Sequence, residues 1–398
     1  MNKYIPHIYI IMWLLYNLQG FLIPVGGMAS RTLLLLILVI SLYYFVFANF
    51  RLKLPKPLKI LSILVAIFTL YGLEPILFGT GDLAFKVAPF GYLKTILISL
   101  LPIYAFYVFF NQGWLSEKGI MRWTVVFVAV AIGQYYIGRQ QLMERIIEAG
   151  SNREEFTNNA GYILVSVLPL LALFWRKPFF QYVLLGVCML YVLMGFKRGA
   201  ILSGALCSIW FIFNSFSAES GSYRSGGRQM FARFLLTVII IASAVYAVQR
   251  VMMTSDYFNY RVQQTVEGDS SLRDIHYNFF WNYFISETSP LRFLFGYGAN
   301  GTLTIWSNYA HNDWLEIAIN NGLFVLLIYA YYWISLIRMF FKGNRRSVLI
   351  MMLGMFIIIY FIRSIFSMSY GDITIYAASA LAYAMVNYES KNGVTIKK

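Results

Sequence analysis

The sequence contains very little charge. Only 12% of its 398 residues are Asp, Glu, Lys or Arg, against about 25% in a typical soluble domain, while 59% are hydrophobic. This composition excludes a soluble globular protein. The chain also has only two cysteines, Cys188 and Cys207, and both fall inside apolar stretches, so we expect no disulfide.

Long apolar runs dominate the chain instead. Twelve of them approach the roughly 20 residues that a helix needs to cross a bilayer. They are continuous and do not alternate polar with apolar residues, which excludes the strands of a membrane β-barrel. We therefore predict an all-α polytopic integral membrane protein, a single membrane domain over residues 1–398 held in the lipid bilayer. The runs cover about 8–25, 32–50, 58–78, 95–111, 122–138, 160–175, 179–195, 200–216, 233–250, 314–337, 347–366 and 372–388.

Basic residues are divided unevenly between the two sides of this predicted bundle. If the N-terminus is cytoplasmic, nineteen of the 32 basic residues but only three of the 17 acidic residues fall in cytoplasmic segments. Lys and Arg prefer that side of a membrane, so this orientation is favoured and both termini are predicted to be cytoplasmic. The basic residues are scattered over six loops and a tail, so the net charge of +15 indicates topology and not nucleic-acid binding.

The longest outer segment is the loop 251–310, between the ninth and tenth runs. Structureless loops of this length are uncommon and are usually functional or disordered, and this one is too aromatic to be disordered. Residues 275–287 can form a helix on the membrane surface or over the bundle. Arg273 then lies in its first turn, where a guanidinium beside exposed amides makes an anion site. The alternative is a surface ion pair between Arg273 and Asp269 or Asp274.

Two more arginines are candidates for ligand binding. Arg198 stands in the tight outer turn 195–199, whose glycines let another group approach closely. It could equally be a cation at a helix C-terminus or one that reaches lipid headgroups. Arg363 lies deep in the eleventh run, where an arginine usually faces a cavity or a partner. Its structural partner would be Glu74 or Asp372.

Two of the three histidines belong to the same loop. His311 precedes the tenth run, with Asp313 and Glu316 able to cap that helix. A helix N-terminus disfavours imidazolium, so His311 should stay neutral and able to act as a general base. The alternative is a purely structural histidine at the membrane boundary. His276 follows Arg273 by three residues and could bind the same anion.

Together these residues form a pattern that resembles the signature of the O-antigen polymerase and ligase superfamily. The order of about twelve spans with one large outer loop also agrees with that family. The resemblance covers roughly residues 155–335 well and the rest by topology alone. The motifs are Asn158-Asn159-Ala160-Gly161, Lys197-Arg198-Gly199-Ala200, Arg273, Gly296-Tyr297-Gly298, Ala310-His311-Asn312-Asp313-Trp314-Leu315-Glu316 and Asn321-Gly322-Leu323.

The resemblance implies a glycosyltransferase of the bacterial inner membrane that needs no metal or cofactor and works on the periplasmic face. The expected donor is an oligosaccharide joined to undecaprenyl pyrophosphate. Arg198 and Arg273 would hold the pyrophosphate, and His311 would take the proton from the acceptor hydroxyl. Asn312, together with Arg363 and His276 from the residue-level reasoning, completes the expected substrate-binding set. The outer segments contain no DxD motif, Walker loop or paired Cys/His ligands.

Three functions are compatible with these residues. A polymerase would transfer the growing glycan onto the next lipid-linked repeat unit, and a ligase would transfer it onto lipid A–core. The form His-Asn-Asp-Trp-Leu-Glu looks more like the polymerases, and the outer segments have little basic excess for a phosphorylated lipid A–core. A chain-length regulator and a flippase would be the protein partners. The third function, a polysaccharide or anion transporter, is disfavoured because no internal repeat is visible and most charges lie at span ends.

Overall fold

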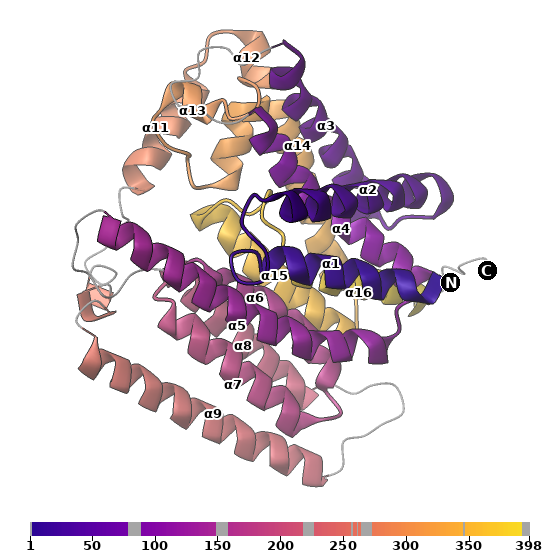
Figure 1. Ribbon diagram of the computed structural model, residues 1–398, viewed down its shortest axis with the longest axis vertical. Helices are drawn as coiled ribbons and strands as arrows, with labels where there is room; N and C mark the ends of the chain where they lie inside the picture. The colour runs from indigo at the N-terminus through magenta and orange to yellow at the C-terminus, as the bar shows by residue number, and fades with distance from the viewer. Residues whose placement is uncertain are drawn as a thin grey trace.

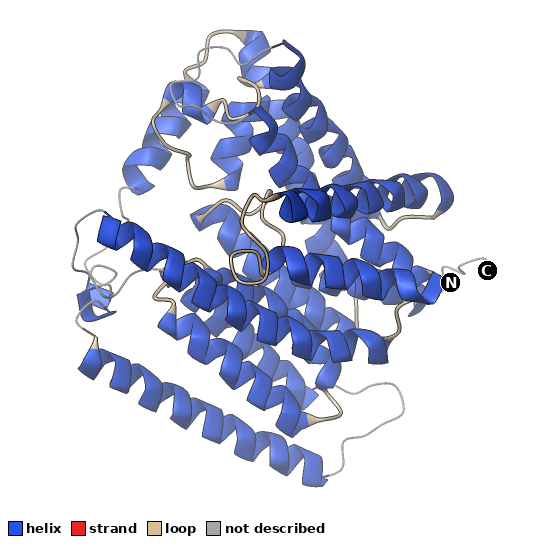
Figure 2. Cartoon of the chain, viewed as in Figure 1, coloured by secondary structure: helices blue, strands red, loops and turns tan. Residues whose placement is uncertain are grey.

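The computed structural model describes most of the chain, and every regular element in the described ranges is a helix (Figure 1, Figure 2). Eight of these helices are long and apolar enough to cross a membrane. The protein is therefore all-helical over this part, as expected of a polytopic membrane protein. The described ranges are 2–78, 89–148, 158–217, 227–255, 258–260, 262–263, 273–344 and 347–391.

The helices follow one another in the order of the predicted apolar runs. Those of the bundle are α1 (Ile5–Asn17), α2 (Met28–Arg51), α3 (Lys56–Phe78), α4 (Pro89–Asn111), α5 (Glu117–Glu148), α6 (Ala160–Leu171), α7 (Pro178–Met194), α8 (Arg198–Ser217), α9 (Gly227–Thr254), α14 (Asp313–Lys342), α15 (Val348–Phe366) and α16 (Ile375–Lys391). The 3₁₀ turns are η1 (Asn2–Tyr4) and η2 (Ala172–Phe174). The outer loop contains α11 (Arg273–Ile285), α12 (Pro290–Phe295) and α13 (Thr302–Ile305).

Each predicted run coincides with a helix, but the extent of the first was wrong. It was expected over 8–25, whereas α1 ends at Asn17. The chain turns at Gly20, whose φ of 91° is a conformation that favours glycine. A 13-residue helix is about 20 Å long, shorter than the roughly 30 Å hydrocarbon core of a bilayer. α6, α7 and α16 are also short, with 12, 17 and 17 residues, so twelve crossings remain a prediction.

The bundle has a protected interior and a lipid-facing periphery. α4 packs against α2, α3 and α16, while α15 packs against α8, α14 and α16. The most apolar parts of α4 and α15 are 72% and 67% buried, against 22% for α2 and 11% for α9. Figure 1 shows α9 along the outside of the bundle beside α7. The exposed apolar side chains of α2 and α9 are those that a bilayer would cover.

The outer loop folds over one end of the bundle. Residues 273–312, here called the cap, pack on the first turns of α14 (Figure 1). Phe280 and Phe284 of α11 enclose a small core with Ala310, Leu315 and Ile319, separate from the main core. The cap is thus a folded unit anchored on α14.

α14 is broken where the cap meets it. Gly322 has φ 77° and ψ 179°, so the helical hydrogen bonding is interrupted there. The amides of Tyr297 and Gly298 compensate, because they donate to the carbonyl oxygens of Ile319 and Asn320 at 2.9 Å each. A polar backbone group buried without a partner is costly, so the cap and the break in α14 stabilise each other.

We predict that Gly322→Ala destabilises the protein far more than Gly186→Ala in α7 does. A Cβ at this position would overlap the Leu294 carbonyl group. The positive φ of residue 322 would cost any side chain a further strain of about 1–2 kcal/mol. The thermal unfolding midpoint of the purified protein measures the effect. Gly186→Ala in α7 is the matched control, because nothing lies within 4 Å of a Cβ there. Equal midpoints for the two variants would contradict the proposed packing.

Candidate functional site

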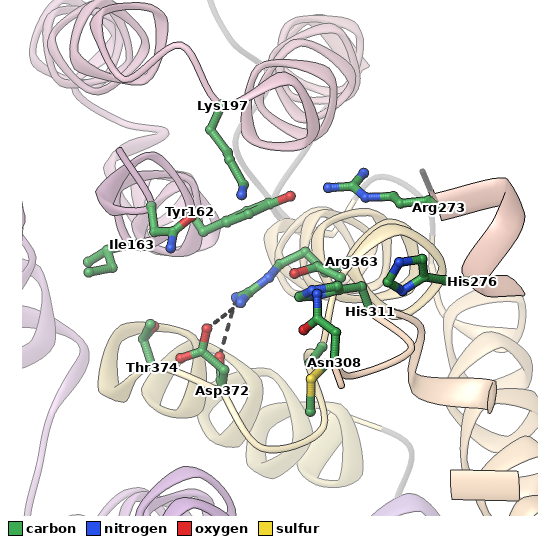
Figure 3. Close-up of a pocket in the computed structure, with 13 residues that line it drawn as sticks. Tyr162, Ile163, Lys197, Arg273, His276, Asn308, His311, Arg363, Asp372 and Thr374 are labelled. Atoms are coloured by element: carbon green, nitrogen blue, oxygen red, sulfur yellow. Dashed lines mark hydrogen bonds and ion pairs between the residues drawn. The ribbon is translucent and has the colours of Figure 1, made fainter. Parts of the chain in front are cut away.

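A cavity of about 610 Å³ lies between the bundle and the cap (Figure 3). Five parts of the chain form its wall: the start of α6, the turn between α7 and α8, α11, the segment before α14, and the connection between α15 and α16. In the predicted topology all five lie on the outer side of the membrane. The cavity therefore gathers side chains that are far apart in sequence at one membrane face.

Two cationic side chains reach this cavity from separate elements. Figure 3 shows Lys197 and Arg273 both extending toward Tyr162. The Lys197 Nζ atom lies 5.9 Å from the centroid of the Tyr162 ring. Arg273 forms no ion pair with Asp274 or with any other residue that the structure describes, and Asp269 lies outside the described ranges. Arg273 thus lies where the anion-site interpretation requires it, and the alternative partner Asp269 lies outside the described residues.

Arg363 has a structural partner in the cavity wall. Its guanidinium forms an ion pair with the carboxylate of Asp372, one of the two partners predicted for it; the other was Glu74. The same guanidinium stacks at 4.5 Å over the ring of Tyr162. Arg363 is 2% exposed while Asp372 is 64% exposed. Arg363 therefore fixes the connection between α15 and α16 and borders the cavity with its charge matched by Asp372.

The turn between α7 and α8 presents Lys197 to the cavity rather than Arg198. Arg198 is the first residue of α8, and the cavity wall includes its neighbour. Phe196 before them has a left-handed φ of 50°, which sets the direction of the turn. Successive residues of a helix point about 100° apart. Lys197 precedes α8 and Arg198 begins it, and of these two residues Lys197 is the one that lines the cavity.

His311 is held in a strained backbone conformation. Its φ of 52° is unusual for a residue other than glycine. The carbonyl oxygen of His311 accepts a hydrogen bond from the Tyr277 hydroxyl at 3.1 Å, and the amide of Ala310 donates to Glu316 at 2.5 Å. Contacts on both sides thus fix the turn, and the imidazole lines the cavity. Strain that the surroundings maintain in this way is typical of functional sites.

Asn312 caps α14. Its Oδ1 accepts hydrogen bonds from the amides of Trp314 at 2.9 Å and Leu315 at 3.1 Å, and its Nδ2 donates to the carbonyl oxygen of Ile365 at 3.0 Å. Asn312 is buried and is not part of the cavity wall. It was predicted to bind substrate, and its contacts instead join the start of α14 to the end of α15.

The two acids that were expected to cap α14 connect it to other segments. Asp313 accepts from the amides of Ser369 and Tyr370 at 2.6 and 3.1 Å, and it also accepts from the Ser369 and Tyr329 hydroxyls. Glu316 accepts from the Thr302 hydroxyl at 2.8 Å, in addition to the Ala310 amide. Asp313 therefore holds the connection between α15 and α16, and Glu316 holds the cap.

The cavity lowers the basicity of His311. Burial lowers the pKa of its imidazole below the ordinary value, and the charges of Arg273 and Lys197 and the neighbouring His276 lower that pKa further. His311 is consequently neutral at pH 7 and able to accept a proton. His276 lies against Trp306, with ring centroids 6.1 Å apart, and its buried Nδ1 makes no hydrogen bond to a described residue.

Comparisons with known proteins leave the function to be inferred from these residues. A scan against protein-family models finds no match, and neither does a search of curated proteins. Within the described ranges, no group of three or more His, Cys, Asp and Glu side chains gathers to hold a metal ion. The residues that line the cavity can bind an anion through Lys197 and Arg273, and they can accept a proton at His311.

We predict that Asn312→Ala lowers the thermal unfolding midpoint more than Asn312→Ser does. Removal of an N-cap costs about 1 kcal/mol, and serine is also a good cap, although it is too short to keep the contact with Ile365. Asn308→Ala is the matched control, because Asn308 is exposed and its side chain bonds only to the next amide. Equal losses for the alanine and serine variants would mean that the cap itself contributes nothing.

Proposed function

We propose that this protein is a polysaccharide polymerase. It transfers a glycan from a polyprenyl pyrophosphate, of the undecaprenyl type, to a hydroxyl group of the next lipid-linked repeat unit, on the periplasmic face of a bacterial inner membrane. The observation that carries this proposal is one cavity that joins two cations, Lys197 and Arg273, to a histidine kept neutral by its surroundings. The resemblance of the motifs around Arg273 and His311 to the polymerase and ligase superfamily supports the same activity.

The two cations suit a pyrophosphate leaving group. As the bond between the sugar and the pyrophosphate breaks, negative charge grows on the departing oxygen. Lys197 and Arg273, placed on separate elements before the reaction begins, stabilise that charge without having to reorganise. Arg273 can also form two parallel hydrogen bonds to one phosphate group. Asp372 does not cancel this field, because its carboxylate is paired with Arg363.

His311 suits the role of general base. The oxygen of the acceptor hydroxyl attacks the anomeric carbon of the donor, and its proton passes to the imidazole of His311. The bond from the anomeric carbon to the pyrophosphate oxygen breaks, and the lipid pyrophosphate leaves with the electron pair. A new glycosidic bond is the product. A base that is neutral at pH 7 is required for this step, and the burial of His311, together with the nearby cations, provides it.

We predict that His311→Ala and Arg273→Ala each abolish polymer formation while the protein still inserts and accumulates. Loss of a general base costs about 10²–10⁴ in rate, and loss of one charge-stabilising group about 10²–10³. The measurement is the glycan ladder of a deletion strain complemented with each variant. His7→Ala and Arg292→Ala are the matched controls, because neither residue lines the cavity.

The pattern of the ladder also separates the candidate functions. Loss of long chains with a single capped repeat retained indicates a polymerase, whereas complete loss of capped lipid A indicates a ligase. Ladders of full length from both variants would overturn the assignment to a glycosyltransferase and favour a transporter.

We further predict that the acidic limb of the pH–rate profile lies below the ordinary imidazole pKa of about 6.5. His311 must be neutral to accept a proton, and its pKa is lowered, so activity persists below that pH and falls as the pH drops through the lowered pKa. Lys197→Gln removes one of the charges that lower the pKa and should move the limb to higher pH. Transfer rates in membrane vesicles supplied with lipid-linked repeat units measure both, with Arg292→Gln as control. A limb that Lys197→Gln leaves in place would contradict the electrostatic explanation.

A further inference from the structure

A second, smaller cavity adjoins the first. It has a volume of about 260 Å³ and lies between the start of α4, the cap and the connection between α15 and α16. Met368 and Asp372 line both cavities, so the two spaces share this part of their walls. The segment before α14 also borders both, because Asn308 and His311 line the first cavity while Tyr309 lines the second.

The lining of the second cavity has a different chemistry from that of the first. Three tyrosines contribute to it, Tyr92, Tyr309 and Tyr370, together with the polar side chains of Asn300 and Thr95. No lysine, arginine or histidine is among the described residues that line it. Among the described residues of this wall, Asp372 is the one with a charged side chain, and its carboxylate is paired with Arg363 while remaining 64% exposed.

The backbone around the second cavity is strained, as it is around the first. Tyr92, which is 6% exposed, forms part of the wall of the second cavity. Asn300 has a left-handed φ of 58°, one of only three such values among the described residues other than glycine. The other two belong to Phe196, next to Lys197, and to His311. Backbone strain in this structure therefore gathers around the two cavities.

The difference in charge decides what each cavity can hold. The described wall of the second cavity offers a pyrophosphate no lysine, arginine or histidine, whereas the wall of the first includes Lys197 and Arg273. An uncharged pyranose presents apolar C–H faces to aromatic rings and hydroxyl groups to carboxylate, amide and hydroxyl partners. Pockets for such ligands combine aromatic walls with a few polar groups, and this composition matches the three tyrosines with Asn300 and Asp372.

We propose that the second cavity is the subsite for the acceptor's terminal sugar, an uncharged pyranose. Its position beside the first cavity lets a bound sugar extend a hydroxyl group past Met368 and Asp372 to the space that His311 lines. The donor's pyrophosphate and the acceptor's sugar are thereby separated by charge. This assignment deepens the proposed polymerase function and rests on it.

Protection of an introduced thiol tests the assignment. The two native cysteines, Cys188 and Cys207, are both fully buried, so they give a low background of labelling. Thr95→Cys places a thiol in the second cavity, and Asn308→Cys places one in the first. A charged, membrane-impermeant thiol reagent is applied to the full-length protein in nanodiscs. The probes are inorganic pyrophosphate and repeat-unit oligosaccharide released from the host's own polysaccharide.

We expect the oligosaccharide to slow labelling of the Thr95→Cys protein about tenfold at a concentration near ten times its Kd. Pyrophosphate should slow labelling of the Asn308→Cys protein and leave the Thr95→Cys protein unchanged. Adding Tyr309→Leu should remove the protection by oligosaccharide without altering the protection by pyrophosphate, which shows that the fold is intact. Trp281→Leu in the cap is the matched aromatic control, since Trp281 is 52% exposed and lines neither cavity.

The failures of the two proposals are distinguishable. Protection of Asn308→Cys by pyrophosphate, with no effect of oligosaccharide on Thr95→Cys, would overturn the acceptor subsite and leave the polymerase proposal standing. Protection of Thr95→Cys by oligosaccharide alone would support the subsite and contradict the donor site. A Thr95→Cys thiol that never reacts would mean that the cavity is closed to solutes, and it would overturn the subsite as well.

Discussion

Two buried carboxylates at the start of α14 hold the outer end of the molecule together. Asp313 binds the connection between α15 and α16, and Glu316 binds the cap. A carboxylate away from water must have its hydrogen-bonding capacity filled, so each acid requires the segments that surround it. The first two turns of α14 thereby hold two parts of the first cavity in place. One is the part of the wall that contains Asp372, and the other is the turn that contains His311.

The electrostatics of the site follow from this arrangement. Arg273 on the cap and Lys197 on the bundle face one cavity, and each lowers the pKa of His311 by its charge. The cations that line the cavity therefore add to the effect of burial, which is the larger cause of the lowered pKa of His311. Arg363 does not add to the positive charge of the cavity, because its charge is matched by Asp372.

The sequence predicted the helices well because apolar runs are local signals. The same runs placed Arg273 and His311 in the outer loop, because both residues lie in the polar segment between the ninth and tenth runs. It misjudged α1, because the turn at Gly20 interrupts an apolar run that composition alone would continue. It named Arg198, whereas the cavity wall includes Lys197, since which of the two lines the cavity depends on the direction of a single turn. Asn312 was predicted to bind substrate, because its role as the N-cap can be recognised only once the start of α14 is known.

The contacts that could not be predicted are those between distant parts of the chain. Asp313 and Ser369 are separated by 56 residues, and nothing in the local pattern of either one indicates the other. Within the segment His311–Glu316, His311 lines the cavity, whereas Asn312, Asp313 and Glu316 do not line it and instead bond to the segments that surround it. A motif of this kind specifies a cavity more than a substrate. Under the proposed function, the acceptor would then be selected by residues outside this segment, and those that line the second cavity lie nearest.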